Sequence, residues 1–498
     1  MHMGNICDRR ECSRGKGGES SCGVRLAFSA ALCFILQACT VGPDYVKPKI
    51  QAPSEFKEAG VWKVSEPRDH LTRGAWWEIF KDPELTALEE QVNISNQNLA
   101  VAEANFRRAV AVVQAARAGY FPTVTAGTSA TRSRSSGNVG RGPGATTSDY
   151  QFAGGASWEL DLWGKVRRSV ESGTASAQSS AADIESVRLS AQAQLAQDYF
   201  QMRTLDAQKA IFDRTIEVYQ KFLQLTKDRY SSGIASKSDI LQAETQLKNA
   251  QAQSTDTGVQ RAAMEHAIAL LVGKAPSELT IPAKPLTGTP PNMPAGLPSE
   301  LLERRPDIAS AERLVAAANA QIGVAEAAYY PTLTLSASGG FEASKIAQWF
   351  AWPSRIWSLG PAMVQQTLFD GGLRRAQTEQ AKASYDATVA SYRQTVLTAF
   401  QEVEDNLAAL RILEQEAGIQ DEAVNAAKES VEVTRNRYKA GTAGSLDVIV
   451  TQAIALNAEI TAINIQGRRM ASGVLLIQAL GGGWNAQDLP AGDRYGQK

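Results

Sequence analysis

The chain has no cysteine beyond residue 39, and this absence limits the chemistry available to most of its length. All five cysteines lie within the first 39 residues, so the rest of the chain can form neither a disulfide nor a thiolate metal site. Aromatic residues make up only 7% of the sequence although 44% of it is apolar. This composition favours helices that pack closely through small side chains.

The chain also lacks a strong net charge and any recognisable catalytic motif. Its formal charge of -1 gives no overall basic field, so a nucleic-acid partner is not expected. Beyond the N-terminal region only His70 and His266 remain, too far apart in sequence to suggest a metal site. Neither a nucleophile elbow nor a zinc-protease helix motif occurs. We therefore expect no enzyme, no bound metal and no cofactor.

Proline is missing from two long stretches, between Pro143 and Pro276 and between Pro361 and Pro490. Because proline removes a backbone donor, these stretches can form unbroken helices. Apolar residues recur there at steps of three and four over several heptads, which favours coiled-coil packing. A helix over 164–231 would be roughly 100 Å long at 1.5 Å per residue.

Each long helical stretch ends at a turn that contains glycine, Gly233 in the first and Gly441 in the second. Helical periodicity then resumes and continues to about residues 273 and 481, which predicts two long antiparallel helical hairpins. A third helical stretch precedes each hairpin, from Glu84 to Ala118 and from Arg304 to Ala328. These two stretches are rich in alanine and should pack against the hairpins.

The two halves of the chain resemble each other at a spacing of about 208 residues, which indicates an internal duplication. Residues 225–230 match residues 433–438, and residues 120–125 match residues 329–334. The predicted organisation is a signal peptide, a lipid-anchored extended segment, a first repeat, a proline-rich linker, a second repeat and a tail, over residues 1–38, 39–83, 84–275, 276–303, 304–481 and 482–498.

Between the predicted helices the apolar period changes from 3.6 to 2. Apolar and polar residues alternate along stretches that begin at Thr123, Tyr150 and Thr332, and a fourth, less regular stretch runs from Ile356 to Phe369. Runs of about ten residues with one apolar and one polar face are typical of outer-membrane barrel strands. Four strands cannot close a barrel, two chains would give a filled barrel of eight, and three would give twelve strands with a lumen. A homotrimer is therefore the smallest assembly expected to form a duct.

The N-terminus reads as a lipoprotein signal peptide. Basic residues precede a short apolar run, from Leu26 to Gln37, which is too short to span a membrane. The run ends in a sequence that resembles the bacterial lipobox, with Cys39 as the residue that would carry a covalent lipid. Thr40 follows the cysteine, which in that system favours export to the outer membrane. The alternative is an ordinary cleavage site with an incidental cysteine.

Nearly the whole mature chain resembles the TolC-like outer-membrane efflux proteins, and specifically their lipoprotein branch that serves resistance-nodulation-division pumps. Four segments carry the resemblance, residues 39–45, 76–85, 302–308 and 368–372. It implies a mostly helical fold, with a trimeric twelve-stranded barrel in the outer membrane continued by a helical tunnel across the periplasm. It also implies that the helical tips, with the turns at Gly233 and Gly441, dock on a periplasmic adaptor fed by an inner-membrane pump.

The resemblance assigns roles to three residues at these tips. Tyr438 and Asp447 match the family's tip tyrosine and pore-facing aspartate, and Asp239 matches an aspartate of the outer hairpin that helps to hold the tip shut. The chain departs from the family pattern at Ala443 and Val450, where better-known members have an arginine and a second aspartate. We therefore expect the links that lock the tunnel to differ here.

Other interpretations of these features stay open. Asp239 lies three residues after Ser236, so it can complete a helix capping box instead of serving the gate; for Asp447 we favour the pore. The glycine-rich segment 137–144 lacks the end of a P-loop and is interpreted as a loop between strands. We interpret the aromatic cluster of Trp349, Phe350, Trp352 and Trp357 as a girdle at the membrane interface. The alternative is an aromatic box that binds a ligand.

Three rival functions remain at this stage. One is a structural lipoprotein that bridges periplasmic layers without a pore, against which the two-faced strands argue. Another is the exit duct of a type I protein-secretion system, which uses the same architecture. An enzyme is the most remote, because no catalytic constellation is visible.

Overall fold

The structure of the chain is a computed structural model that describes residues 40–53, 55–59, 74–138, 144–291 and 301–489. The predicted signal peptide, Cys39 and His70 lie outside the described residues. The chain divides into two compact units. We call them the sheet unit, which among the described residues comprises 40–44, Ala116–Glu171 and Asn319–Lys382, and the helical unit, which comprises the other described residues.

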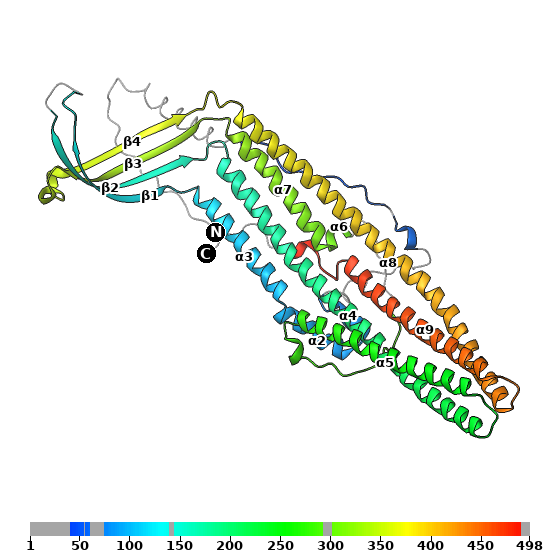
Figure 1. The fold of residues 1–498 in the computed structure, drawn as a ribbon. Helices are drawn as coiled ribbons and strands as arrows, with labels where there is room; N and C mark the ends of the chain where they lie inside the picture. The colour runs from blue at the N-terminus through cyan, green and yellow to red at the C-terminus, as the bar shows by residue number, and fades with distance from the viewer. Residues whose placement is uncertain (1–39, 54, 60–73, 139–143, 292–300, 490–498) are drawn as a thin grey trace, which may run out of the picture. The chain divides into compact units, whose positions relative to one another are not determined.

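The predicted duplication is visible in the lengths of the helices (Figure 1). Helices α4 and α8 each have 67 residues, α5 and α9 each have 35, and α3 and α7 each have 22. Their bounds are Lys165–Ser231, Leu373–Lys439, Lys237–Leu271, Ser445–Ala479, Gln97–Ala118 and Pro306–Ala327, in that order. The two predicted helical hairpins, α4 with α5 and α8 with α9, are therefore confirmed.

The helical stretch predicted from Glu84 to Ala118 is wrong as a single helix. The structure has two helices there, α2 over Pro83–Ser95 and α3, with Asn96 in an extended conformation between them. The Asn96 side chain accepts a hydrogen bond from the Leu99 backbone at 3.1 Å and donates one to the Leu271 carbonyl at 2.8 Å. These contacts compensate for the broken helical ladder, because buried amide groups need partners.

The helical stretch predicted from Arg304 to Ala328 begins slightly later than predicted. Helix α7 starts at Pro306 rather than at Arg304, after a separate turn, α6, over Leu301–Arg304. Proline suits the first position of a helix because its ring fixes φ and no backbone N–H is needed there.

Four antiparallel strands form one sheet in the order β1-β2-β3-β4, over Thr123–Arg134, Thr146–Leu160, Thr332–Ala343 and Arg355–Gln365. The fourth strand was predicted to continue to Phe369, and that prediction is wrong by four residues. Gln365 pairs with Thr332, the first residue of β3, so no partner residue remains beyond this point.

The register of the strands assembles one apolar and one polar face. Phe152 lies opposite both Phe341 and Thr128, and Trp158 lies opposite Leu335, whereas Ser157 lies opposite Ser336. Directly opposed residues in an antiparallel sheet project to the same side. The alternation predicted from the sequence is thus in phase across the strands. Large residues on the apolar face are solvent-exposed, such as Val124, Trp357, Leu359 and Val364.

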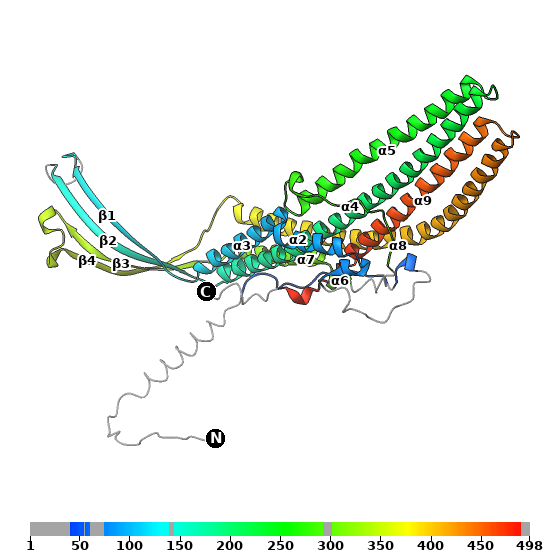
Figure 2. The same cartoon turned by 90° about the horizontal axis from the view of Figure 1, so that it is seen from below.

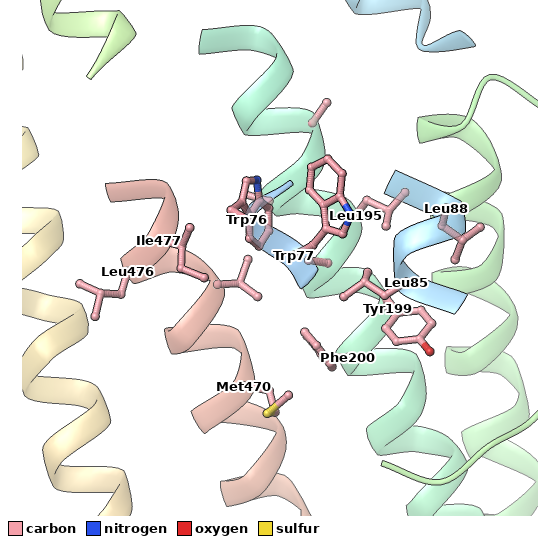
Figure 3. Packing of buried hydrophobic residues seen from close by; sticks show 14 of the residues in the cluster. Trp76, Trp77, Leu85, Leu88, Leu195, Tyr199, Phe200, Met470, Leu476 and Ile477 are labelled. Carbon is pink, nitrogen blue, oxygen red and sulfur yellow. The ribbon is translucent and has the colours of Figure 1, made fainter. Parts of the chain in front are cut away.

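The main core of the helical unit joins residues that are far apart in the sequence (Figure 3). Trp76 and Trp77 belong to this core together with buried residues of α2, α4 and α9, such as Leu85, Leu195 and Ile477. Within it the Trp76 ring donates to Gln192 Oε1 at 3.2 Å, and Tyr199 donates to Asp82 Oδ2 at 2.8 Å. The tryptophans that carry part of the family resemblance are therefore buried structural residues.

Candidate functional site

The two hairpin turns are built in the same way, and they lie at the same end of the helical unit (Figure 2). Gly233 has φ of +74° and Gly441 has φ of +78°. Each glycine donates its N–H to the carbonyl of the tyrosine three residues earlier, Tyr230 at 2.9 Å and Tyr438 at 3.0 Å. Glycine is needed at both places because a left-handed backbone is costly for residues with a side chain.

Both predicted aspartates begin the helix that follows the turn. The Asp239 backbone N–H donates to Ser236 Oγ at 3.2 Å, and Asp239 Oδ2 accepts the Ser236 N–H at 2.8 Å. This is a capping box, so the structural interpretation offered for Asp239 is present. Asp447 makes only one of the two bonds of a capping box. Its Oδ2 accepts the Gly444 N–H at 2.9 Å, but Gly444 has no side chain that can accept the Asp447 N–H.

Asp239 also links the two hairpins to each other. Its Oδ1 accepts a short hydrogen bond from the Ser445 hydroxyl, at the first residue of α9. This bond is the largest cause that holds the pKa of the Asp239 carboxyl below its usual range, followed by the Ser236 backbone bond and, more weakly, the Arg229 charge. Burial of the carboxyl acts in the opposite direction but does not prevail. The group is therefore a carboxylate at neutral pH.

A second link between the hairpins joins Arg229 to Tyr438. The Arg229 guanidinium donates to the Tyr438 carbonyl at 2.8 Å and lies 4.5 Å from the centre of its ring. Tyr438 is only 4% exposed, and its ring centre is 5.4 Å from that of Phe222. In the single chain Tyr438 is thus an anchor packed between the hairpins.

The residues at which the chain departs from the family pattern occupy different surroundings. Ala443 packs against the tip cluster around Tyr438, while Val450 is 47% exposed. Asp447 is exposed as well, one turn before Val450 on α9. The structure therefore brings Asp239 and Tyr438 into the contacts that hold the hairpins together and leaves Asp447 outside them.

Sequence reasoning missed the partners in both links, Arg229 and Ser445. The only signal for Arg229 is the Arg-Tyr pair that recurs at the same place in both repeats, as Arg437-Tyr438 in the second. Ser445 carries no sequence signal, because its role depends on how the two hairpins pack.

No group of three or more His, Cys, Asp or Glu side chains that could hold a metal ion occurs in the described part of the chain. The contacts that join the hairpins at the tips are hydrogen bonds, ring packing and a guanidinium–ring contact.

The family described as outer membrane efflux protein matches residues 88–274 and 297–482. The toluene efflux pump outer membrane protein TtgC of Pseudomonas putida is 31% identical over 465 residues, which cover 92% of this chain and 95% of that protein. The pyoverdine export outer membrane protein OpmQ of Pseudomonas aeruginosa is also 31% identical, with 91% and 96% covered.

Solved structures show the same fold. The outer-membrane channel OprN has a TM-score of 0.84 at 31% identity, with 90% of this chain and all of that chain covered. The MtrE outer membrane channel of Neisseria gonorrhoeae, in its open state, has a TM-score of 0.77 at 27% identity, with 91% and 100% covered. The chain belongs to the outer membrane efflux protein family.

Proposed function

We propose that this chain is the outer-membrane exit duct of a tripartite pump of the resistance-nodulation-division type, which conducts small molecules passively. The observation that carries the proposal is the sheet, which has an apolar and a polar face in phase across its strands. Such a sheet suits a wall between lipid and an aqueous lumen. The names of relatives that export toluene or pyoverdine support small-molecule cargo over protein cargo.

The open edges of the sheet support assembly into a homotrimer. Among the described residues β1 pairs only with β2, and β4 pairs only with β3, so both outer strands keep unpaired backbone groups. Such groups cannot remain unpaired in lipid. Three chains, joined β4 to β1, would close twelve strands around a lumen.

Apolar side chains on the helices support the same assembly. Leu446, Val450 and Ile454 follow one another at steps of four on α9 and are 58%, 47% and 55% exposed. Contiguous exposed apolar surface is typical of a site of protein association. In the proposed trimer this stripe packs against a neighbouring copy.

The hairpin tips are proposed as the periplasmic gate and the adaptor-docking surface. The links from Asp239 to Ser445 and from Arg229 to Tyr438 would restrain the tip, and Asp447 would face the pore. The turns at Gly233 and Gly441 would contact the periplasmic adaptor. Exposed turns with fixed backbone geometry suit a partner that docks by shape.

A lipid on Cys39 is proposed as an additional anchor, and the residues that follow Cys39 support it. The Arg168 guanidinium, whose side chain is 4% exposed, donates to the carbonyls of Val41 and Gly42 at 3.2 and 3.0 Å and pairs with Asp44 at 2.9 Å. The Val41 N–H donates to the Trp163 carbonyl at 3.2 Å, between β2 and α4. Residues 41–44 are thus fixed at the helix-side end of the sheet.

Single-channel recording tests the proposal. Purified full-length protein, reconstituted in a planar bilayer, should give discrete conductance steps, and the same preparation should be trimeric by mass measurement. In cells that lack their own duct, the chain expressed with an adaptor and a pump of this type should restore efflux. A folded trimer that never conducts would favour the structural-lipoprotein interpretation instead.

A further inference from the structure

The turn end of the sheet carries a row of positive charge that the proposed channel function does not use. The strands enter and leave the helices at one end, so the β1–β2 and β3–β4 turns lie at the other (Figure 1). In the sequence, no Asp or Glu occurs over residues 131–148 or 343–369. The same stretches contain Arg132, Arg134, Arg141, Lys345 and Arg355.

The strand register places three of these arginines on the apolar face. Arg132 and Arg134 pair with Ser148 and Thr146, which continues the alternation that puts Thr128 opposite Phe152. Arg355 pairs with Phe341, which itself lies opposite Phe152. All three arginines are exposed, and they project to the same side as the apolar band.

The two carboxylates at this end of the sheet lie on the other face. Asp149 pairs with Thr131, and Glu342 pairs with Gln151, both in the polar row. In the described part of the chain none of the three guanidinium groups forms an ion pair. The apolar face therefore ends in arginines that have no counter-charge on their own side.

Aromatic side chains pack on this face at the level of Arg355, which pairs with Phe341. The Phe350 ring centre lies 6.1 Å from that of Phe152 and 5.6 Å from that of Phe341, and Trp349 stacks on Phe350 at 5.2 Å. Aromatic side chains at this place suit the level of the lipid headgroups. Arg355 is thus at headgroup level, and Arg132 and Arg134 lie nearer the turn end of the sheet.

Two contacts with Trp352 fix the position of the Arg355 guanidinium. Its Nε donates to the Trp352 carbonyl at 2.9 Å, and its guanidinium lies 3.1 Å from the centre of the Trp352 ring. Trp352 is 71% exposed and Phe350 is 64% exposed. A guanidinium fixed by stacking loses less freedom when it binds a phosphate, for which its planar fork is well suited.

We propose that Arg132, Arg134 and Arg355 bind the phosphate groups of a glycolipid in the outer leaflet of the membrane. The proposal rests on the outer-membrane placement proposed above. Arg132 and Arg134 lie about 7 Å apart, two residues along one strand. When β4 of one copy pairs with β1 of the next, Arg355 and this pair lie on neighbouring strands, so the proposed site is shared between two copies.

Binding of bisphosphorylated lipid A to the full-length protein in detergent tests the proposal. The test variant is Arg132→Gln/Arg134→Gln/Arg355→Gln. The matched control, Arg107→Gln/Arg108→Gln/Arg375→Gln, removes the same charge from exposed arginines on helices. We expect the test variant to lose about tenfold or more in affinity and the control to stay within about twofold, with binding weakened by salt.

Further ligands identify the chemistry and the source. Dephosphorylated lipid A, with the same acyl chains, should bind weakly, as should inorganic phosphate alone. Equal affinity for the dephosphorylated lipid would overturn the role of phosphate, and equal affinity for inorganic phosphate would overturn the role of the lipid. If the glutamine variant does not fold, Arg132→Lys/Arg134→Lys/Arg355→Lys keeps the charge but not the fork, and wild-type affinity in that variant would also count against the site.

Failure of this inference is distinguishable from failure of the proposed function. Wild-type protein that conducts in bilayers but binds lipid A no better than the test variant would overturn the arginine site alone. Protein that neither inserts nor conducts would overturn the channel itself.

Discussion

At the scale of single residues, Glu89 departs most clearly from the usual rules of burial. Its side chain on α2 is 0% exposed, and neither carboxyl oxygen has a hydrogen-bond partner among the described residues. Burial in the core raises the pKa of Glu89 to about 9. An isolated buried carboxylate is costly, so the group stays protonated at neutral pH.

Glu89 should make the protein less stable as the pH rises. The folded pKa lies above the unfolded value, so its stabilising contribution is complete below about pH 4.5 and is lost as the pH increases towards 9. The expected loss is about 1.4 kcal/mol per pH unit within this window. Thermal unfolding of wild type and Glu89→Gln at pH 5 and pH 8 measures it, and the midpoint of wild type should fall relative to that of the variant.

The neighbouring Glu90 provides the control. It is exposed on the same helix, so Glu90→Gln should follow the wild-type pH dependence. A pH dependence of Glu89→Gln equal to that of wild type would show that the carboxyl ionises without penalty.

Cys39→Ala should abolish lipidation, because no other cysteine follows it in the chain. The protein should still fractionate with membranes, since the proposed barrel is a separate and larger attachment. Growth with labelled fatty acid checks the first expectation and membrane fractionation the second. Label retained by the variant would exclude Cys39 as the acylated residue.

Asp447 offers a test between two roles, because its carboxylate caps α9 and is also exposed. In a trimer, three copies would form a ring of carboxylates that attracts cations. Asp447→Asn should therefore lower cation preference, read from reversal potentials in a salt gradient. A loss of about 0.5 to 2 kcal/mol in stability with unchanged selectivity would favour capping instead. Asp421→Asn, also exposed and on α8, is the matched control.

At the scale of elements, the two hairpins form a restrained pair. Asp239 and Ser445 join the start of α5 to the start of α9, and Arg229 joins the end of α4 to Tyr438 at the end of α8. Because each link involves one partner from each repeat, separating the hairpins requires both to break.

Ser445→Ala and Asp239→Asn should loosen this contact. The variants remove the donor or weaken the acceptor of one link, so the resting conductance in bilayers should increase for both. Acid should act in the same direction: the pKa of Asp239 is lowered in the folded protein, so its contribution is present at neutral pH and is lost as the pH falls through that lowered value. Asp256→Asn, exposed elsewhere on α5, should leave the conductance unchanged, and an identical effect of Asp256→Asn would contradict a local link.

The elements that could be predicted from the sequence are those set by local patterns. The long helices follow from the absence of proline, and the faces of the strands follow from alternation. The break at Asn96 was missed because it depends on a carbonyl 175 residues away, at Leu271. Arg229 and Ser445 were missed for the same reason, since only the packing of one hairpin on the other gives them partners.

At the scale of the whole molecule, the described sheet is incomplete by itself. The two copies of the repeat contribute two strands each, and they pair with each other in the middle of the sheet through β2 and β3. The first and last strands therefore remain as edges. Within one chain, Thr125 on β1 and Ser358 on β4 lie at the same level of the sheet. Thr125 is opposite Gly155, Gly155 is opposite Ser338, and Ser338 is opposite Ser358.

Engineered cysteines on the two edges should report how many chains close the barrel. Three strand spacings, about 14 Å, separate β1 from β4 within a chain, which exceeds the roughly 7 Å that a disulfide can bridge. A bond between Ser358→Cys and a cysteine on β1 must therefore join two copies. Because the register between copies is unknown, Ser358→Cys is combined in turn with Thr125→Cys, Gly127→Cys and Ser129→Cys, all on the polar face.

In one of these registers, oxidation of the detergent-solubilised protein should give a covalent ladder that ends at three chains. A ring of three consumes every thiol, so no larger species should form however long the oxidation continues. Ser358→Cys alone has no partner on β1 and should not produce the ladder. A ladder that stops at two chains or continues past three would contradict the trimer, and monomer in all three registers would contradict closure through β1 and β4.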